Sequence, residues 1–307
     1  MMAFRQYPLP LSILGGVLSA APYFLLATPS LGGMLLTYFS TLPLFAVGLG
    51  LGFSSALIAG AAGIVLSLIF SMMSGSFGLA IPYAIFNVIP TILILFKALQ
   101  YRTDESGEPH YTPSVNLMNF LTSMALGIAG VSFLLIQFSL AQSGENLSAL
   151  IQAAMGPQPA ETILILTALI KVLPGIVAMS WAMMALMNAI LAQGLLKAFG
   201  KNLRPSPDVC DVYPLPIFYY ILAALGVMTL LPLGVFSDAS SNLIIPALLP
   251  FLLTGIGTVH AIARKFSYAS WILFGFYTVA LLLSWPFFFL VPLGLIEPWV
   301  KLRNRIA

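Results

Sequence analysis

Long apolar runs recur along the whole chain, and each matches the roughly 20 residues that a helix needs to cross the hydrocarbon core of a bilayer. Of the 307 residues, 60% are hydrophobic and only 7% are charged, whereas a soluble globular domain carries about 25% charged residues. So few charges do not cover a water-facing surface of this size. Transmembrane strands are segments of about ten residues with alternating character, and the sequence lacks that pattern. The sequence therefore predicts an all-α fold, a polytopic transmembrane helical bundle.

Basic residues cluster in the loops after the fourth, sixth and eighth predicted spans, whereas the segments 141–161 and 236–242 contain no Lys or Arg. Basic loops remain in the cytoplasm. We therefore expect a multi-pass membrane protein with a cytoplasmic N-terminus, and the family resemblance described below implies the bacterial inner membrane. The eight predicted spans are 9–28, 33–52, 54–73, 78–97, 115–140, 162–190, 214–235 and 243–263.

Two segments leave alternatives open. Residues 268–296 form an apolar run that is roughly 43 Å long as one helix. One crossing places the basic tail, 301–305, outside, whereas two short crossings keep it inside, with Trp285 and Pro286 at a hairpin tip. The sequence favours the tail inside and leaves the number of crossings open. The segment 147–155 is too short to span and is either an amphipathic helix on the outer face or a partly ordered loop.

Two stretches carry a family resemblance. Residues 41–70 read TLPLFAVGLGLGFSSALIAGAAGIVLSLIF, and residues 249–305 contain VHAIAR and close on GLIEPWVKLRNR. Together they resemble the YybS-like family of predicted bacterial membrane proteins, a domain-of-unknown-function family. The closing motif departs from the family pattern, because Glu297 and Pro298 stand where an aspartate and a polar residue are expected.

That family is grouped by resemblance with the substrate-binding S-components of energy-coupling-factor vitamin transporters and with the cell-shape protein MreD. The resemblance implies an S-component-like six-helix membrane domain over 1–200, followed by C-terminal membrane helices with a basic tail over 201–307. The vitamin-binding loops of S-components have no recognisable counterpart in this sequence. The resemblance therefore implies an architecture rather than an activity.

The sequence predicts no enzymatic activity, no cofactor and no metal site. The chain has two histidines, His110 and His260, and no H-E-x-x-H zinc motif. The predicted spans contain no Asp or Glu, which argues against an aspartyl intramembrane protease and against an antiporter built on buried carboxylates. The net charge of +3 lies in short loops and ends, so we expect no nucleic-acid partner. The acids, all expected in loops and at ends, are Asp104, Glu105, Glu108, Glu145, Glu161, Asp208, Asp211, Asp238 and Glu297.

Small residues recur at four-residue spacing, which lets helix backbones approach closely. The spacing favours simple core packing and leaves docking onto a membrane-protein partner as the alternative. In S-components, small residues of the first helix face the coupling subunit, so the resemblance implies such a role for the first-span pair. The predicted helix-packing residues are Gly48, Gly52, Ala56, Gly60, Gly16 and Ala20.

Lys171 is a charge inside the sixth predicted span, roughly 15 Å along the helix from its outer end, and no predicted span offers a carboxylate to pair with it. Three outcomes are open. The side chain extends to the outer interface, it is deprotonated or bound to carbonyls freed near Pro174, or it binds an anionic group in a polar cavity. Asn87, Tyr83 and Trp181 either form interhelical hydrogen bonds or line a ligand pocket with Lys171.

Two functions follow from the sequence. The first is a binding or transport subunit for a small or lipid-like molecule, without its own ATPase because the chain has no Walker motif. The alternative is an MreD-like scaffold that organises envelope machinery through helix–helix contacts. The expected partners are the lipid bilayer, an anionic lipid or small molecule, and a membrane protein.

Overall fold

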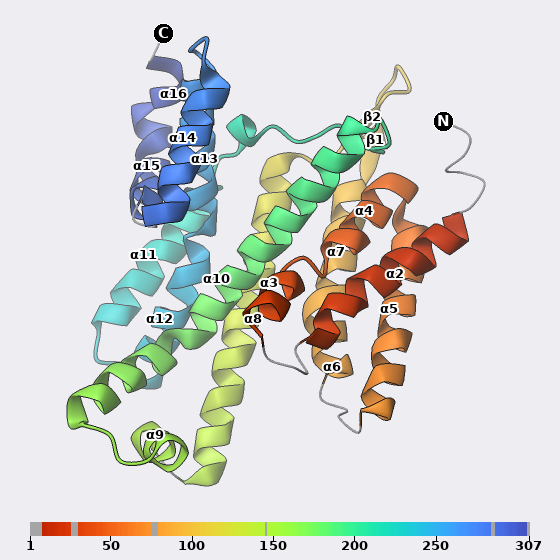
Figure 1. Ribbon diagram of the computed structural model, residues 1–307. Helices are drawn as coiled ribbons and strands as arrows, with labels where there is room; N and C mark the ends of the chain where they lie inside the picture. Colours follow the sequence, from red (N-terminus) through yellow and green to blue (C-terminus); the bar gives the residue numbers. More distant parts are fainter. Residues whose placement is uncertain (1–7, 26–29, 75–78, 145, 284–285, 306–307) are drawn as a thin grey trace. The chain divides into compact units, whose positions relative to one another are not determined.

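The computed structural model describes residues 8–25, 30–74, 79–144, 146–283 and 286–305 and is almost entirely helical (Figure 1). The predicted all-α class is confirmed. Within these residues, six helical stretches are long and apolar enough to cross a membrane, so the chain is a multi-pass membrane protein. Among the described residues of the predicted spans 9–28 and 214–235, the structure has the shorter apolar helices Pro8–Phe24 and Pro216–Leu230. The six stretches are Leu31–Leu51, Phe53–Met73, Ala80–Leu99, Ser114–Gln142, Ala160–Ala198 and Val235–Ala263.

The chain forms two compact units. Unit 1 comprises Met1–Pro113 and Met183–Pro207, and unit 2 comprises Ser114–Ala182 and Asp208–Ala307. The helices of 114–182 pack with those that follow residue 207, and the domains 1–200 and 201–307 stay a prediction.

Unit 1 is a group of helices with one short β-hairpin. Its elements are α2 (Pro8–Phe24), α3 (Leu31–Thr37), α4 (Leu42–Leu51), α5 (Phe53–Met73), α6 (Ala80–Tyr83), the π-helix η2 (Ala84–Val88), α7 (Ile89–Leu99), β1 (Tyr101–Thr103), β2 (Pro109–Tyr111) and the last part of α10 (Ala160–Ala198). The strands pair in antiparallel fashion, with Arg102 opposite His110.

Gly52 separates α4 from α5. Its φ of 104° lies in a region that only glycine adopts readily, so the chain leaves helical geometry there. The predicted four-residue series is therefore not one helix face, since Gly48 lies on α4 whereas Ala56 and Gly60 lie on α5. A Cβ atom at Gly48 would meet the side chain of Leu95, and one at Gly60 would meet that of Val88.

Helices α2 and α5 pack backbone against backbone (Figure 1). A Cβ atom at Gly16 would lie 2.1 Å from the carbonyl oxygen of Ala59 and 2.9 Å from the amide nitrogen of Gly63. Ala20, one turn later on α2, is fully buried in the same core. The small residues of the first helix thus lie inside unit 1, at a helix crossing.

A buried arginine holds the hairpin end of unit 1 together. Arg204 donates hydrogen bonds to the carbonyl oxygens of Ala98, at 2.7 Å, and Thr112, at 3.1 Å. Its guanidinium carbon lies 5.7 Å from the centre of the Tyr111 ring. Burial lowers the pKa of Arg204. The side chain ties the end of α7 and the exit of the hairpin to the loop after α10.

Unit 2 contains the longest helices. Its elements are α8 (Ser114–Ser143), α9 (Leu147–Met155), the first part of α10, the 3-10 helix η3 (Val209–Asp211), α11 (Pro216–Leu230), α12 (Val235–Ala247), α13 (Leu249–Ala263), α14 (Ala269–Leu283), α15 (Pro286–Val300) and α16 (Leu302–Arg305). The run 268–296 is thus divided between two helices, and Trp285 lies outside the described residues. The segment 147–155 is helical, capped by the Asn146 side chain.

Helices α13 and α15 form the second close crossing. A Cβ atom at Gly294 would lie 1.8 Å from the carbonyl oxygen of Phe251, and one at Gly255 would lie 2.0 Å from that of Leu290. Both glycines face the backbone of the opposite helix. Gly255 and Gly294 were not among the predicted packing residues.

A second buried arginine, Arg303, links the C-terminal end of unit 2 to α13 and to the segment at Cys210. Arg303 donates to the side-chain oxygen of Thr258, to the carbonyl oxygen of Thr254 and to that of Cys210. Its Nε lies 3.8 Å from a carboxylate oxygen of Glu297, which is 1% exposed and also accepts the Arg303 backbone N–H. Glu297 lies in the last turn of α15, as expected for an acid at an end, but its side chain is buried.

Candidate functional site

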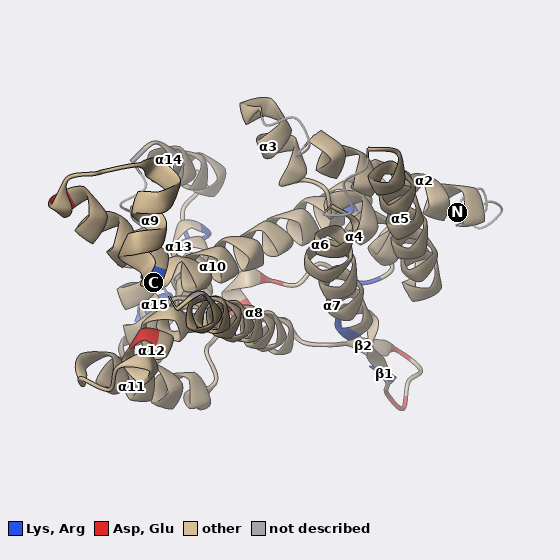
Figure 2. Cartoon of the chain, turned by 90° about the horizontal axis from the view of Figure 1, so that it is seen from below, with Lys and Arg blue, Asp and Glu red and all other residues tan. Residues whose placement is uncertain are grey.

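Lys171 and Asp238 form an ion pair between α10 and α12. Their Nζ and Oδ2 atoms are 3.7 Å apart, and the two side chains are 53% and 38% exposed. The prediction that no carboxylate is available to Lys171 was therefore wrong. Residues 236–242 were read as a loop, whereas α12 begins at Val235 and places Asp238 in its first turn. Figure 2 shows a red, acidic segment at α12.

Asn242, one turn after Asp238, links α12 to the backbone of α10. Its Nδ2 donates to the carbonyl oxygen of Lys171 at 2.7 Å, and its Oδ1 accepts the N–H of Gly175 at 3.0 Å. These two backbone groups are the partners of one regular α-helical hydrogen bond. The fully buried amide therefore binds both ends of a helical turn that contains Pro174.

Gly175 permits this approach. A Cβ atom there would lie 2.3 Å from the carbonyl oxygen of Asn242, which no side chain tolerates. Sequence reasoning missed Asn242 and Asp238 because both fell in a presumed loop. Their four-residue spacing, which places them on one face of a helix, and the Pro174–Gly175 pair inside an apolar run were the available signals.

The spacing of charges places this pair at an edge of the apolar layer. From Lys171, the next charge on α10 is Lys197, about 26 residues or roughly 39 Å further along the helix. Asp238 precedes Arg264 by the same spacing across α12 and α13. Each stretch exceeds the roughly 30 Å of a hydrocarbon core. Lys171 thus fits the interface rather than the middle of the bilayer.

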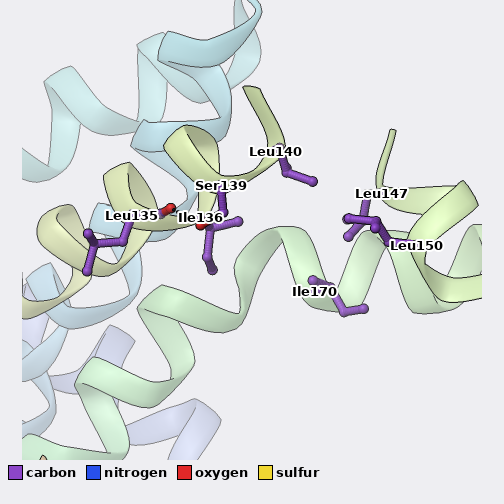
Figure 3. Close-up of a pocket in the computed structure, with 7 residues that line it drawn as sticks. All are labelled: Leu135, Ile136, Ser139, Leu140, Leu147, Leu150 and Ile170. Carbon is purple, nitrogen blue, oxygen red and sulfur yellow. Dashed lines mark hydrogen bonds between the residues drawn. The ribbon is translucent and has the colours of Figure 1, made fainter. Parts of the chain in front are cut away.

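An apolar cavity of about 490 Å³ lies beside α10 in unit 2 (Figure 3). It is an open hollow lined by side chains of α8, α9 and α10. The hydroxyl of Ser139, its one polar side chain, donates to the carbonyl oxygen of Leu135. Ile170 brings the cavity wall to the residue next to Lys171. The lining residues are Leu135, Ile136, Ser139, Leu140, Leu147, Leu150 and Ile170.

Two of the predicted pocket residues, Tyr83 and Asn87, lie one turn apart in unit 1. The Tyr83 hydroxyl is 2.8 Å from Ser19 Oγ. Asn87 Oδ1 accepts a hydrogen bond from Ser40 Oγ at 2.8 Å. Both side chains are buried. These hydrogen bonds link Tyr83 to α2 and Asn87 to the turn before α4. Such contacts agree with the interpretation that the two side chains form hydrogen bonds between elements.

Trp181 is buried on α10 in unit 2. It follows Lys171 by about ten residues, or roughly 15 Å along the helix. The structure therefore does not bring these two residues together, and Tyr83 and Asn87 belong to the other unit. A ligand contact at any of the four remains a prediction.

The described residues contain no group of three or more His, Cys, Asp or Glu side chains placed to hold a metal ion. The candidate site of unit 2 is thus an apolar cavity with one ion pair beside it. No protein-family model matches the chain, and comparisons with curated proteins and with solved structures find no match.

Proposed function

We propose that the protein is a membrane-embedded binding subunit for a lipid-like molecule, the apolar part of which occupies the cavity between α8, α9 and α10. The cavity carries this proposal. Its volume of about 490 Å³ falls within the range of ligand pockets, about 300–1,000 Å³. The hollow is open, and its apolar lining offers water few polar partners. An apolar occupant therefore stabilises this region.

The resemblance to S-components supports a subunit that binds without hydrolysing ATP. We place it in the bacterial inner membrane with the N-terminus and the basic loops in the cytoplasm. The cavity then opens on the outer side, because α9 and its flanking loops, 141–161, contain no Lys or Arg. A lipid-like ligand would reach it from the outer leaflet.

Cysteine labelling in intact cells tests this orientation. Native Cys210 should not react with a membrane-impermeant thiol reagent, whereas a Glu161→Cys reporter in a Cys210→Ser background should. Burial and the neighbouring Asp208 raise the pKa of the Cys210 thiol, so it reacts slowly even when accessible. Labelling in permeabilised cells at higher pH supplies the control. Reaction of Cys210 in intact cells would invert the orientation.

Native mass spectrometry of the purified protein tests the binding function. We expect a co-purified lipid-like molecule that is lost in Leu150→Trp and Ile170→Trp, since the indole fills the cavity. Leu134→Trp is the matched control, because Leu134 is exposed on α8 and does not line the cavity. A protein without bound lipid that co-purifies with a stoichiometric membrane protein would instead support the MreD-like scaffold.

A further inference from the structure

We infer that the ligand is an anionic amphiphile whose head group binds Lys171, and that Asp238 is a built-in competitor for that head group. The inference rests on the proposed function, since it adds a polar subsite to the apolar cavity. Four features of unit 2 carry it: the reach of the lysine, the scarcity of cations, the looseness of the ion pair and the backbone link beneath it.

Lys171 does not itself line the cavity, and on α10 its side chain points about 100° away from that of Ile170, so the length of the lysine side chain has to bridge the difference. Ile170 lines the cavity, and the Cα atom of Lys171 is about 3.8 Å from that of Ile170. A lysine has a flexible four-carbon stem. A molecule whose tail packs against Ile170 therefore presents its head group within reach of the Lys171 ammonium.

Lys171 is the one cation in this part of the chain. The sequence has no other Lys or Arg between Ser114 and Leu196, and none between Pro205 and Ala263. Because the pair lies at the edge of the apolar layer, the ammonium is at the depth where lipid head groups lie. An anionic head group at the cavity therefore has one residue of opposite charge to bind.

The Lys171–Asp238 pair is loose enough to be exchanged. Its 3.7 Å separation is longer than the roughly 2.7–2.9 Å of a strong charge-assisted hydrogen bond. The ion pair of Arg264 with Asp208 in the same unit is 2.6 Å long. Since exposed ion pairs contribute little to stability, replacing the carboxylate of Asp238 with that of a ligand, or with a phosphate, has a small cost.

The helix contact does not depend on this ion pair. Asn242 holds the backbone of α10 through the carbonyl oxygen of Lys171 and the N–H of Gly175. The side chain of Lys171 is thus free to turn from Asp238 to a ligand while α10 and α12 stay together. Asp238 limits affinity and makes the site selective for head groups that compete with a carboxylate.

Lipid retention by the full-length protein in nanodiscs tests the inference. The probes are phosphatidylglycerol, which is anionic, and phosphatidylcholine with the same acyl chains, which is zwitterionic. We expect the wild-type protein to retain phosphatidylglycerol preferentially. Lys171→Met should abolish the preference without loss of phosphatidylcholine, and Lys171→Arg should keep it. Asp238→Asn should raise phosphatidylglycerol retention about two- to fivefold, the range expected from removing an exposed ion pair.

The outcomes separate the two proposals. If the wild-type protein retains neither lipid, the proposed function fails. If it retains both equally, or if Asp238→Asn lowers retention as much as Lys171→Met, the cavity stands but the head-group site does not. If inorganic phosphate alone displaces phosphatidylglycerol from the protein, the site binds free anions, and the inference that its ligand is an anionic amphiphile fails. Thermal unfolding of each variant, with Ser237→Ala on the same turn as a control, shows that the fold is intact.

Discussion

Each unit brings two helices into backbone contact through glycine, but the surroundings of the two crossings differ. In unit 2, Gly255 and Gly294 both face carbonyl oxygens of the opposite helix, so a Cβ atom on either side meets backbone. In unit 1, a Cβ atom at Gly16 meets backbone, whereas one at Gly63 lies closest to the hydroxyl of Tyr83, at 2.5 Å. On that side of the unit 1 crossing the nearest backbone atom, the carbonyl oxygen of Gly16, is 3.1 Å away, so the backbone approach is less tight than in unit 2.

The buried arginines differ in a similar way. Arg204 in unit 1 donates to backbone carbonyl groups and lies over an aromatic ring. Arg303 in unit 2 also donates to carbonyl groups but has a fully buried carboxylate, Glu297, beside it. In both comparisons, unit 2 has the contact that tolerates a substitution less well: backbone against backbone at the glycines, and a buried carboxylate beside the arginine. We therefore expect equivalent substitutions to destabilise unit 2 more than unit 1.

The largest effect is expected from Arg303→Met. It removes the guanidinium and leaves the Glu297 carboxylate buried without its cation, which costs about 3–5 kcal/mol. Arg204→Met loses hydrogen bonds to carbonyl groups, at about 1–3 kcal/mol. Thermal or denaturant unfolding in detergent measures both. Adding Glu297→Gln to Arg303→Met should recover part of the loss, and equal losses for the two arginines would contradict the comparison.

Gly294→Ala comes second. The added methyl group would lie 1.8 Å from the carbonyl oxygen of Phe251, so α13 and α15 must separate. Overpacking of this kind costs about 1–3 kcal/mol or more. Gly275→Ala is the control, because nothing lies within 4 Å of its Cβ position on α14. It should be neutral or stabilising by up to about 1 kcal/mol. Similar melting temperatures for the two variants would refute the α13–α15 contact.

Gly16→Ala is expected to have a slightly smaller effect. Its methyl group meets the carbonyl oxygen of Ala59 at 2.1 Å, but on the Gly63 side of the crossing the nearest backbone atom is 3.1 Å from the Cβ position. We expect a loss of about 1–2 kcal/mol. Gly194→Ala, with nothing within 4 Å, is the control. A loss greater than that of Gly294→Ala would reverse the order of the two units.

The unit 1 crossing was the one accessible from the sequence. Gly16 and Ala20 stand four residues apart in one helix, which is the pattern that indicates close packing. Gly294 has no small residue four positions away on α15, so its contact depends on where α13 happens to pass. A contact between helices distant in sequence has no local signal. The sequence therefore predicted the class of the fold and most of the long helices, but it gave a local signal for only one of the two crossings.

The candidate site shows the same limit. Lys171 was predicted because a charge in an apolar run is conspicuous. Asp238 was missed because its polar neighbours resembled a loop, although α12 includes them. Arg303 was read as a marker of orientation, whereas its side chain is buried. The cavity was not predictable, since its lining residues are ordinary apolar residues of three helices that only the tertiary fold brings together.

The smallest effect is expected from Gly48→Ala in unit 1. The methyl group would lie 2.4 Å from Leu95 Cδ1, but that atom is the end of a flexible side chain. Rotation of Leu95 costs about 0.5–1.5 kcal/mol, and the helix propensity of alanine returns up to about 1 kcal/mol. We therefore expect a change in unfolding free energy of less than about 1 kcal/mol. Leu95→Val removes the clashing methyl group, so a double-mutant cycle should give a favourable coupling between the two substitutions. If Gly48→Ala is as damaging as Gly294→Ala, side-chain adaptability does not distinguish the units, and the depth of burial alone sets the response.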